Sequence, residues 1–142
     1  MCRATNVCLQ FFKEMIMNFL SKLVFLFALL FSACSQADPS AFEQAQFDAL
    51  LSEGKPVLVS IHADWCPTCR AQAKIISSLT SDEKYKNVTI TRVSFDNQKD
   101  VVRNFKAFRQ STLIAYKAGK EVGRSIGDTS PTSIEQLIQK TL

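Results

Sequence analysis

The stretch that decides the fold runs from Pro56-Val-Leu-Val-Ser-Ile-His62 into Trp65-Cys66-Pro67-Thr68-Cys69. Its first half is an apolar, β-branched run that predicts a buried strand. Pro67 fits the first turn of a helix, where a missing N–H costs little, and apolar residues continue at helical spacing to about residue 78. The two cysteines are therefore expected where a strand gives way to a helix.

This position favours a reactive thiol. Unpaired N–H groups and the dipole at a helix start stabilise a thiolate, which is the reactive form of cysteine. Cys69 follows Cys66 within one helical turn, close enough to form a small disulfide. The pair is suited to dithiol–disulfide exchange, and we expect the Cys66 sulfur to be ionised and open to solvent.

A CxxC pair can also be half of a zinc site, which needs four ligands. The other cysteines are Cys2, Cys8 and Cys34, all ahead of the predicted domain, and His62 is the single histidine. Because too few ligands are at hand for a closed site, we predict no metal.

Residues 1–37 are predicted to be a signal or targeting segment, and residues 38–142 the folded domain. Residues 23–31 form an unbroken apolar run, too short for a membrane span of about 20 residues but suited to the core of a signal peptide. Because such signals start close to the initiator, Met17 is the predicted start and residues 1–16 an upstream extension.

Phe31-Ser-Ala-Cys34 resembles the lipobox of bacterial lipoproteins, whose cysteine is lipidated, although Phe31 replaces the usual leucine. The alternative is ordinary cleavage after Ala37, which the small residues Ser35 and Ala37 permit. Either route exports the domain to a compartment where disulfides persist. We expect a periplasmic protein anchored to the membrane by Cys34, or a soluble one after cleavage at Ala37.

Composition narrows the class of partner. The chain has 142 residues and a net charge of +4. No basic run interleaved with aromatic residues is present, so nucleic acid is not an expected partner. The length after the targeting segment allows one domain, and we expect a monomer.

Periodicity predicts four helices and four strands. The helices are expected near residues 40–53, 66–78, 97–108 and 133–142, with Asn97 or Asp100 as the cap of the third, and the strands near 56–62, 88–95, 112–117 and 121–126. Alternating elements that end in a hairpin predict an α/β fold, a mixed four-stranded sheet with helices on both faces. The cysteines then lie beyond the carboxyl end of a central strand, where reaction sites gather.

Two segments carry a family resemblance. Val57 to Cys69 is similar to the active-site segment of thioredoxin-fold proteins, and Leu113 to Val122 is similar to their terminal hairpin. Ala63-Asp-Trp-Cys66 in particular resembles exported members of the family that carry reducing equivalents. The resemblance covers about residues 40–142 and implies a thioredoxin-like fold with a redox-active Cys66–Cys69 disulfide. In that case Cys66 attacks a substrate disulfide and Cys69 resolves the mixed disulfide that forms. No separate cofactor is expected.

The resemblance also implies a substrate-binding surface. Trp65 would be a flat docking surface beside the sulfur; core packing of this tryptophan is the alternative. Gln110 and Ser111 match the positions that contact substrate, and Ser111 replaces the family's cis-proline. A cis bond before a residue other than proline costs about 2.5–4 kcal/mol, so the Gln110–Ser111 bond is expected to be trans.

Two further positions differ from the family pattern or support the site. Ser60 replaces a buried carboxylate that assists the resolving thiol, and it cannot act as a base near neutral pH. Arg92 replaces a lysine near that carboxylate. If the Arg92 side chain points toward the thiols, its positive charge would lower their pKa values. The alternative is that Arg92 is a solvated strand residue. Pro67 is expected to support the start of the helix.

These features predict a periplasmic thiol–disulfide oxidoreductase that reduces disulfides of exported proteins and is re-reduced by a membrane electron carrier. Dithiol potentials in this fold span about −270 to −120 mV, so the sequence leaves the direction open. Two other functions stay open as well. One is a copper-binding assembly factor that uses both thiols and His62, because soft thiolates suit Cu(I). The other is a non-catalytic binding domain with a structural disulfide.

Overall fold

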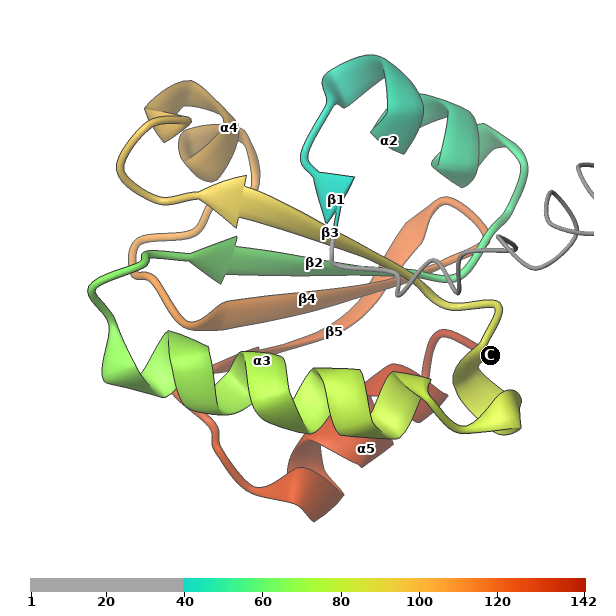
Figure 1. The fold of residues 1–142 in the computed structure, drawn as a ribbon. Helices are drawn as coiled ribbons and strands as arrows, with labels where there is room; N and C mark the ends of the chain where they lie inside the picture. Colours follow the sequence, from blue (N-terminus) through green and yellow to red (C-terminus); the bar gives the residue numbers. More distant parts are fainter. Residues whose placement is uncertain (1–39) are drawn as a thin grey trace, which may run out of the picture. The chain divides into compact units, whose positions relative to one another are not determined.

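A five-stranded mixed sheet organises residues 40–142, the part of the chain that this computed structural model describes (Figure 1). The strands are β1 (Ser40–Ala41), β2 (Val57–His62), β3 (Thr89–Ser94), β4 (Thr112–Lys117) and β5 (Lys120–Ile126), in the spatial order β1-β3-β2-β4-β5. β1, β3 and β2 are parallel, whereas β4 is antiparallel to β2 and β5 is antiparallel to β4. The predicted mixed sheet is confirmed, and the two-residue β1 adds an edge strand to it.

Helices cover both faces of the sheet, as predicted. They are α2 (Gln44–Ser52), α3 (Pro67–Thr80), α4 (Lys99–Asn104) and α5 (Pro131–Gln139), with a short 3-10 helix, η1 (Glu83–Tyr85), after α3. Figure 1 shows α2 and α4 on one face and α3 and α5 on the other. Because β2 is central in this sandwich, all six of its residues are buried, which explains why its sequence lacks polar alternation.

An aromatic cluster fills the core on the side of α2 and α4. Phe42, Phe47, Phe105 and Tyr116 pack with ring centroids 5.3 to 6.3 Å apart, mostly edge to face. This is the arrangement that aromatic quadrupoles favour. The core under α3 and α5 is mainly aliphatic and includes Leu58, Ile76, Leu113, Ile134 and Ile138.

The first predicted helix starts later than expected. Ser40 and Ala41 pair with β3, and the N–H of Phe42 donates to the carbonyl of Arg92 at 2.9 Å. The open edge of β3 offers backbone partners that a helical turn here could not reach. The helix therefore begins only at Gln44.

The predicted caps of α4 are wrong. The N-cap is Gln98, which makes no side-chain cap hydrogen bond. Its amide instead fastens the preceding turn: Oε1 accepts the N–H of Ser94 at 2.8 Å, and Nε2 donates to the carbonyl of Phe42 at 3.1 Å. The Gln98 side chain thus joins the preceding turn to Phe42 and does not cap α4.

The predicted hairpin at the end of the sheet is confirmed, and a tight turn joins β4 to β5. Ala118 and Gly119 have φ values of +47° and +76°. Positive φ at both central residues matches the right-handed twist of a two-stranded hairpin, and glycine adopts it without steric cost.

The predicted targeting segment, Cys34 and the start at Met17 lie outside the described residues. Within residues 40–142, no helix has the length and apolar character needed to cross a membrane.

Truncating the aromatic cluster should destabilise the domain strongly. Phe47 is 7% exposed and contacts the other three rings of the cluster, so Phe47→Ala should lower the free energy of unfolding by about 3–5 kcal/mol. Phe108→Ala is the matched control, because Phe108 is 89% exposed and its loss should change the same quantity by no more than about 0.5 kcal/mol. Urea denaturation measures both, and equal losses would contradict this account of the core.

Candidate active site

Cys66 caps the helix that carries the CxxC motif. Its backbone is extended, with φ −84° and ψ 115°, and its sulfur accepts the N–H of Cys69 at 3.1 Å. Pro67 occupies the first helical turn, where no N–H is needed. The thiol therefore takes the place of the serine or aspartate oxygen that usually caps a helix.

Both thiols are free, and a third side chain lies against them. The Oγ of Ser111 is 3.1 Å from the sulfur of Cys66 and 3.1 Å from the sulfur of Cys69. Ser111 precedes β4 and is distant from the cysteines in the sequence. The sequence placed it near the disulfide as a substrate contact, but did not predict a hydroxyl that touches both sulfurs.

Hydrogen bonds favour the thiolate of Cys66. Burial alone would raise its pKa, but donors around the sulfur outweigh burial and lower the pKa below its usual value. These donors are the thiol of Cys69, the hydroxyl of Ser111 and the backbone N–H groups of Cys69 and Thr68. Charge-assisted hydrogen bonds of this kind are stronger than those between neutral groups.

Cys69 behaves in the opposite way. Burial raises its pKa first, and donation of its own proton to Cys66 and the negative charge there raise it further. The hydroxyl of Ser111 opposes this effect. The Cys66 thiol is therefore the easier of the two to ionise, and the Cys69 thiol keeps its proton more readily, which is the order that an attacking and a resolving cysteine need.

The expected solvent exposure of Cys66 needs correction. The residue is only 3% exposed and packs with Ala63, Cys69 and the half-buried Phe95. This covering shields the sulfur from bulk water. Hydrogen bonds to the sulfur are stronger for that reason, because water does not compete for it.

The loop at Ser111 is built differently from a loop with a cis-proline. Residues 40–142 contain no cis peptide bond, so the predicted trans bond before Ser111 is confirmed. Ser111 has φ +60°, and its N–H donates to the carbonyl of Ile61 at 2.9 Å. Proline could provide neither this φ nor this hydrogen bond. Gln110, the other predicted substrate contact, is half-buried in the same loop.

Trp65 lies on the surface beside the thiols. It is 59% exposed, and its Nε1 donates to Oδ2 of Asp96 at 2.9 Å. The alternative of core packing is therefore wrong. The hydrogen bond ties the ring to the loop that follows β3.

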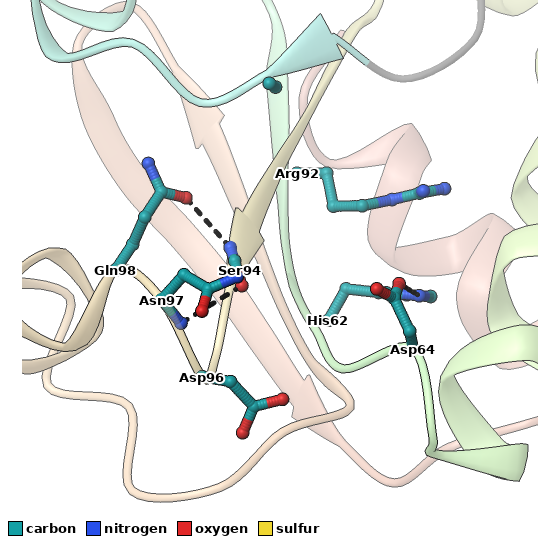
Figure 2. Close-up of a pocket in the computed structure, with 8 residues that line it drawn as sticks. His62, Asp64, Arg92, Ser94, Asp96, Asn97 and Gln98 are labelled. Carbon is teal, nitrogen blue, oxygen red and sulfur yellow. Dashed lines mark hydrogen bonds and ion pairs between the residues drawn. The ribbon is translucent and has the colours of Figure 1, made fainter.

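A polar cavity of about 300 Å³ opens at the carboxyl ends of β2 and β3 (Figure 2). It is lined by Ala41, His62, Asp64, Arg92, Ser94, Asp96, Asn97 and Gln98. The cavity shares Asp96 with the Trp65 hydrogen bond, but neither cysteine lines it. It therefore lies next to the dithiol rather than over it, and sequence reasoning did not predict it.

Arg92 and His62 belong to this cavity. Figure 2 shows their side chains extending in the same direction, with Asp64 beside the imidazole. The distance from Nε2 of His62 to Oδ1 of Asp64 is 3.5 Å. Burial and then the charge of Arg92 lower the pKa of His62, while Asp64 opposes the shift. The sequence left open whether Arg92 acts on the thiols or is a solvated strand residue. The charge of Arg92 lowers the pKa of His62, whereas neutral hydrogen-bonding groups lower the Cys66 pKa.

The described residues do not bring His62 together with the two cysteines as a set of metal ligands. Within residues 40–142, no three His, Cys, Asp or Glu side chains gather as a metal site would require. His62, the third ligand of the copper hypothesis, faces Asp64 instead. Ser60 is buried on β2 and brings no carboxylate to the site.

Comparison with known proteins identifies the family. The family profile described as Thioredoxin matches residues 38–140.

The chain belongs to the thioredoxin family.

Thioredoxin-2 of Saccharomyces cerevisiae is 34% identical over 95 residues, which are 66% of this chain and 88% of that protein. Thioredoxin of Mycobacterium tuberculosis H37Rv is 33% identical over 78 residues, 55% of this chain and 66% of the relative. Among solved structures, Trxlp from Edwardsiella tarda EIB202 superposes with a TM-score of 0.68 and 37% identity, covering 70% of this chain and 96% of the other.

The thioredoxin comparisons and the geometry agree. Thioredoxin homologues are thiol–disulfide oxidoreductases, and this chain keeps their CxxC pair with Cys66 and Cys69 in contact. The chain is thus a thioredoxin-family thiol–disulfide oxidoreductase. The serine that faces its dithiol is where it differs from the expected pattern.

The pH dependence of alkylation should separate the two thiols. Because the Cys66 pKa is lowered, its iodoacetamide alkylation rate should have a midpoint below that of an unperturbed cysteine thiol. Cys69, with its raised pKa, should have a midpoint above that value. Peptide mapping by mass spectrometry over a pH series measures both; the midpoint is informative even though shielding slows the absolute rates. Coincident midpoints would contradict the assigned roles.

Proposed function

We propose that this protein is a periplasmic reductase of disulfides in other exported proteins. The observation that carries the proposal is the asymmetric dithiol: the Cys66 sulfur accepts a backbone N–H at the start of α3 and has a lowered pKa, whereas the pKa of Cys69 beside it is raised. Cys66 attacks a substrate disulfide and forms a mixed disulfide, and Cys69 then releases the reduced substrate. A membrane electron carrier restores the dithiol.

The environment of the sulfurs supports the proposed direction of electron transfer. A dithiol becomes a strong oxidant when the protein strongly stabilises its reduced, thiolate form. Here burial opposes ionisation of both cysteines, and no cationic side chain is among the groups that lower the Cys66 pKa. A reduced form that is stabilised without cations and against burial supports donation of electrons to substrates.

The surface near the sulfurs suits a protein substrate. Trp65 offers an exposed aromatic ring held by Asp96, and Phe108, in the loop that leads to Ser111, is almost fully exposed. Large apolar side chains exposed at a reactive site are typical of surfaces that bind other proteins. The export of the domain rests on the signal-like residues 23–31 and the lipobox-like residues 31–34.

Turnover should depend on both cysteines in different ways. With dithiothreitol as electron source, the protein should catalyse reduction of insulin disulfides, and Cys66→Ser should abolish this activity because the nucleophile is lost. Cys69→Ser should retain the attack but accumulate a mixed disulfide, visible on non-reducing gels. The potential of the couple should lie nearer to about −270 mV than to about −120 mV.

Three results would contradict the proposal. Insulin reduction that persists in Cys66→Ser would exclude the mechanism. A potential near the oxidising end would reverse the direction. Tight stoichiometric Cu(I) binding with negligible turnover would favour the copper-binding function.

Anchoring should depend on Cys34. Expressed in a Gram-negative host, the protein should fractionate with membranes, and mass spectrometry should find a lipidated Cys34 as its first residue. Cys34→Ala should block lipidation, while Cys8→Ala, the matched control, should leave it unchanged because residues 1–16 precede the predicted start. An unlipidated chain that begins at Asp38 would support ordinary cleavage after Ala37 and contradict the anchor.

A further inference from the structure

The hydroxyl of Ser111 is placed to do chemistry at both sulfurs. Its Oγ is 3.1 Å from each, which makes it the one side chain shown bridging the two thiols in the part of the chain described here. Ser111 is 4% exposed, so solvent does not readily replace this contact. A hydroxyl has one proton to donate and two lone pairs to accept, and it rotates freely between partners.

The backbone of Ser111 is fixed from three directions. Its N–H donates to the carbonyl of Ile61, and its carbonyl accepts the N–H of Gly127 at 2.8 Å. Nε2 of Gln72, a residue only 1% exposed on α3, donates to the same carbonyl at 3.1 Å. These bonds link the residue to β2, to the end of β5 and to α3. The backbone that carries the hydroxyl is thus held in place.

The rest of the site leaves a role for such a group. At the position where the resemblance places a buried carboxylate, this chain has Ser60, which cannot take up a proton near neutral pH. Arg92 faces the neighbouring cavity. The Cys66 thiolate is therefore stabilised by short-range donors, and Ser111 is the single side-chain donor among them apart from Cys69 itself.

We propose that Ser111 is a catalytic residue whose Oγ–H stabilises the negative charge on whichever of the two cysteine sulfurs carries it during dithiol–disulfide exchange. This proposal rests on the proposed function and deepens it. In the first half-reaction the hydroxyl donates to the Cys66 thiolate. After the mixed disulfide forms, the Cys66 sulfur is neutral, and the hydroxyl turns to Cys69.

The chemistry balances without a further reactant. The Cys66 thiolate displaces one substrate sulfur, which leaves as a thiolate, so one S–S bond breaks and one forms. Cys69 then attacks the Cys66 sulfur; the mixed S–S bond breaks, the Cys66–Cys69 bond forms, and the second substrate sulfur leaves with its electron pair. The proton from Cys69 ends on a departing substrate thiolate. Two electrons pass from the dithiol to the substrate, and Ser111 is unchanged.

The test uses two variants of the whole protein that lack the hydroxyl. Ser111→Ala removes Oγ with the least change in volume, and Ser111→Gly removes it while suiting the positive φ at this position. In both variants the Cys66 titration, followed by thiolate ultraviolet absorbance, should move upward by about one pH unit, the effect of a lost charge-assisted hydrogen bond. The resolving step, followed as decay of a preformed mixed disulfide, should slow about tenfold.

Ser60→Ala is the matched control, because it removes another buried serine hydroxyl without removing a contact to either sulfur. Its titration and resolving rate should match those of the natural protein. If Ser111→Ala and Ser111→Gly also match the natural protein, Ser111 only fills space and the proposal is overturned. If only Ser111→Ala is impaired, the cause is backbone strain and the proposal is likewise overturned. Failure of insulin reduction by the natural protein would instead reject the proposed function, since the titration does not depend on turnover.

Discussion

The hydrogen bond from the backbone N–H of Cys69 to the sulfur of Cys66 is the interaction on which the site depends. It exists because β2 ends at His62 and α3 begins at Pro67, so the short connection turns the Cys66 side chain back over the first helical turn. Backbone donors at a helix start are fixed by the fold, and they need not reorganise when charge develops on the sulfur. The thiolate is thus favoured by geometry that the helix maintains for its own stability.

The topology of the sheet explains why Ser111 also lies against the Cys66 sulfur. β4 runs antiparallel to β2, with Ile61 opposite Thr112, so the residue before β4 meets the end of β2. In thioredoxin-like proteins this position faces the dithiol, and a serine there brings a hydroxyl where proline brings only carbon. The hydrogen bond from its N–H to Ile61 stabilises a loop conformation that proline could not adopt. A single change of residue type therefore alters both the backbone and the chemistry at the sulfurs.

The sequence predicted the regular elements well because their hydrophobic patterns are strong. The apolar run of β2 and the spacing of Ile134, Leu137 and Ile138 on α5 each admit one arrangement around a buried sheet. Features set by tertiary hydrogen bonds were not predictable in this way. The strand at Ser40–Ala41 depends on a free edge of β3, which no local pattern reveals. For the site, the cysteines were evident from their spacing, whereas the hydroxyl contact of Ser111 required a pairing between distant segments; its one visible signal was a serine where the family has proline.

The low exposure of Cys66 is consistent with its reactivity once the source of thiolate stabilisation is considered. A thiolate that relied on distant cations would lose support to salt and water, because solvent screens long-range charge. Here the support comes from donors in direct contact with the sulfur, and burial removes the water that would compete with them. Burial also disfavours the charge itself, so the two effects offset each other, and the balance depends on how many donors remain in contact. A site of this design is sensitive to single hydrogen bonds, and for this reason the position of one serine hydroxyl can govern its chemistry.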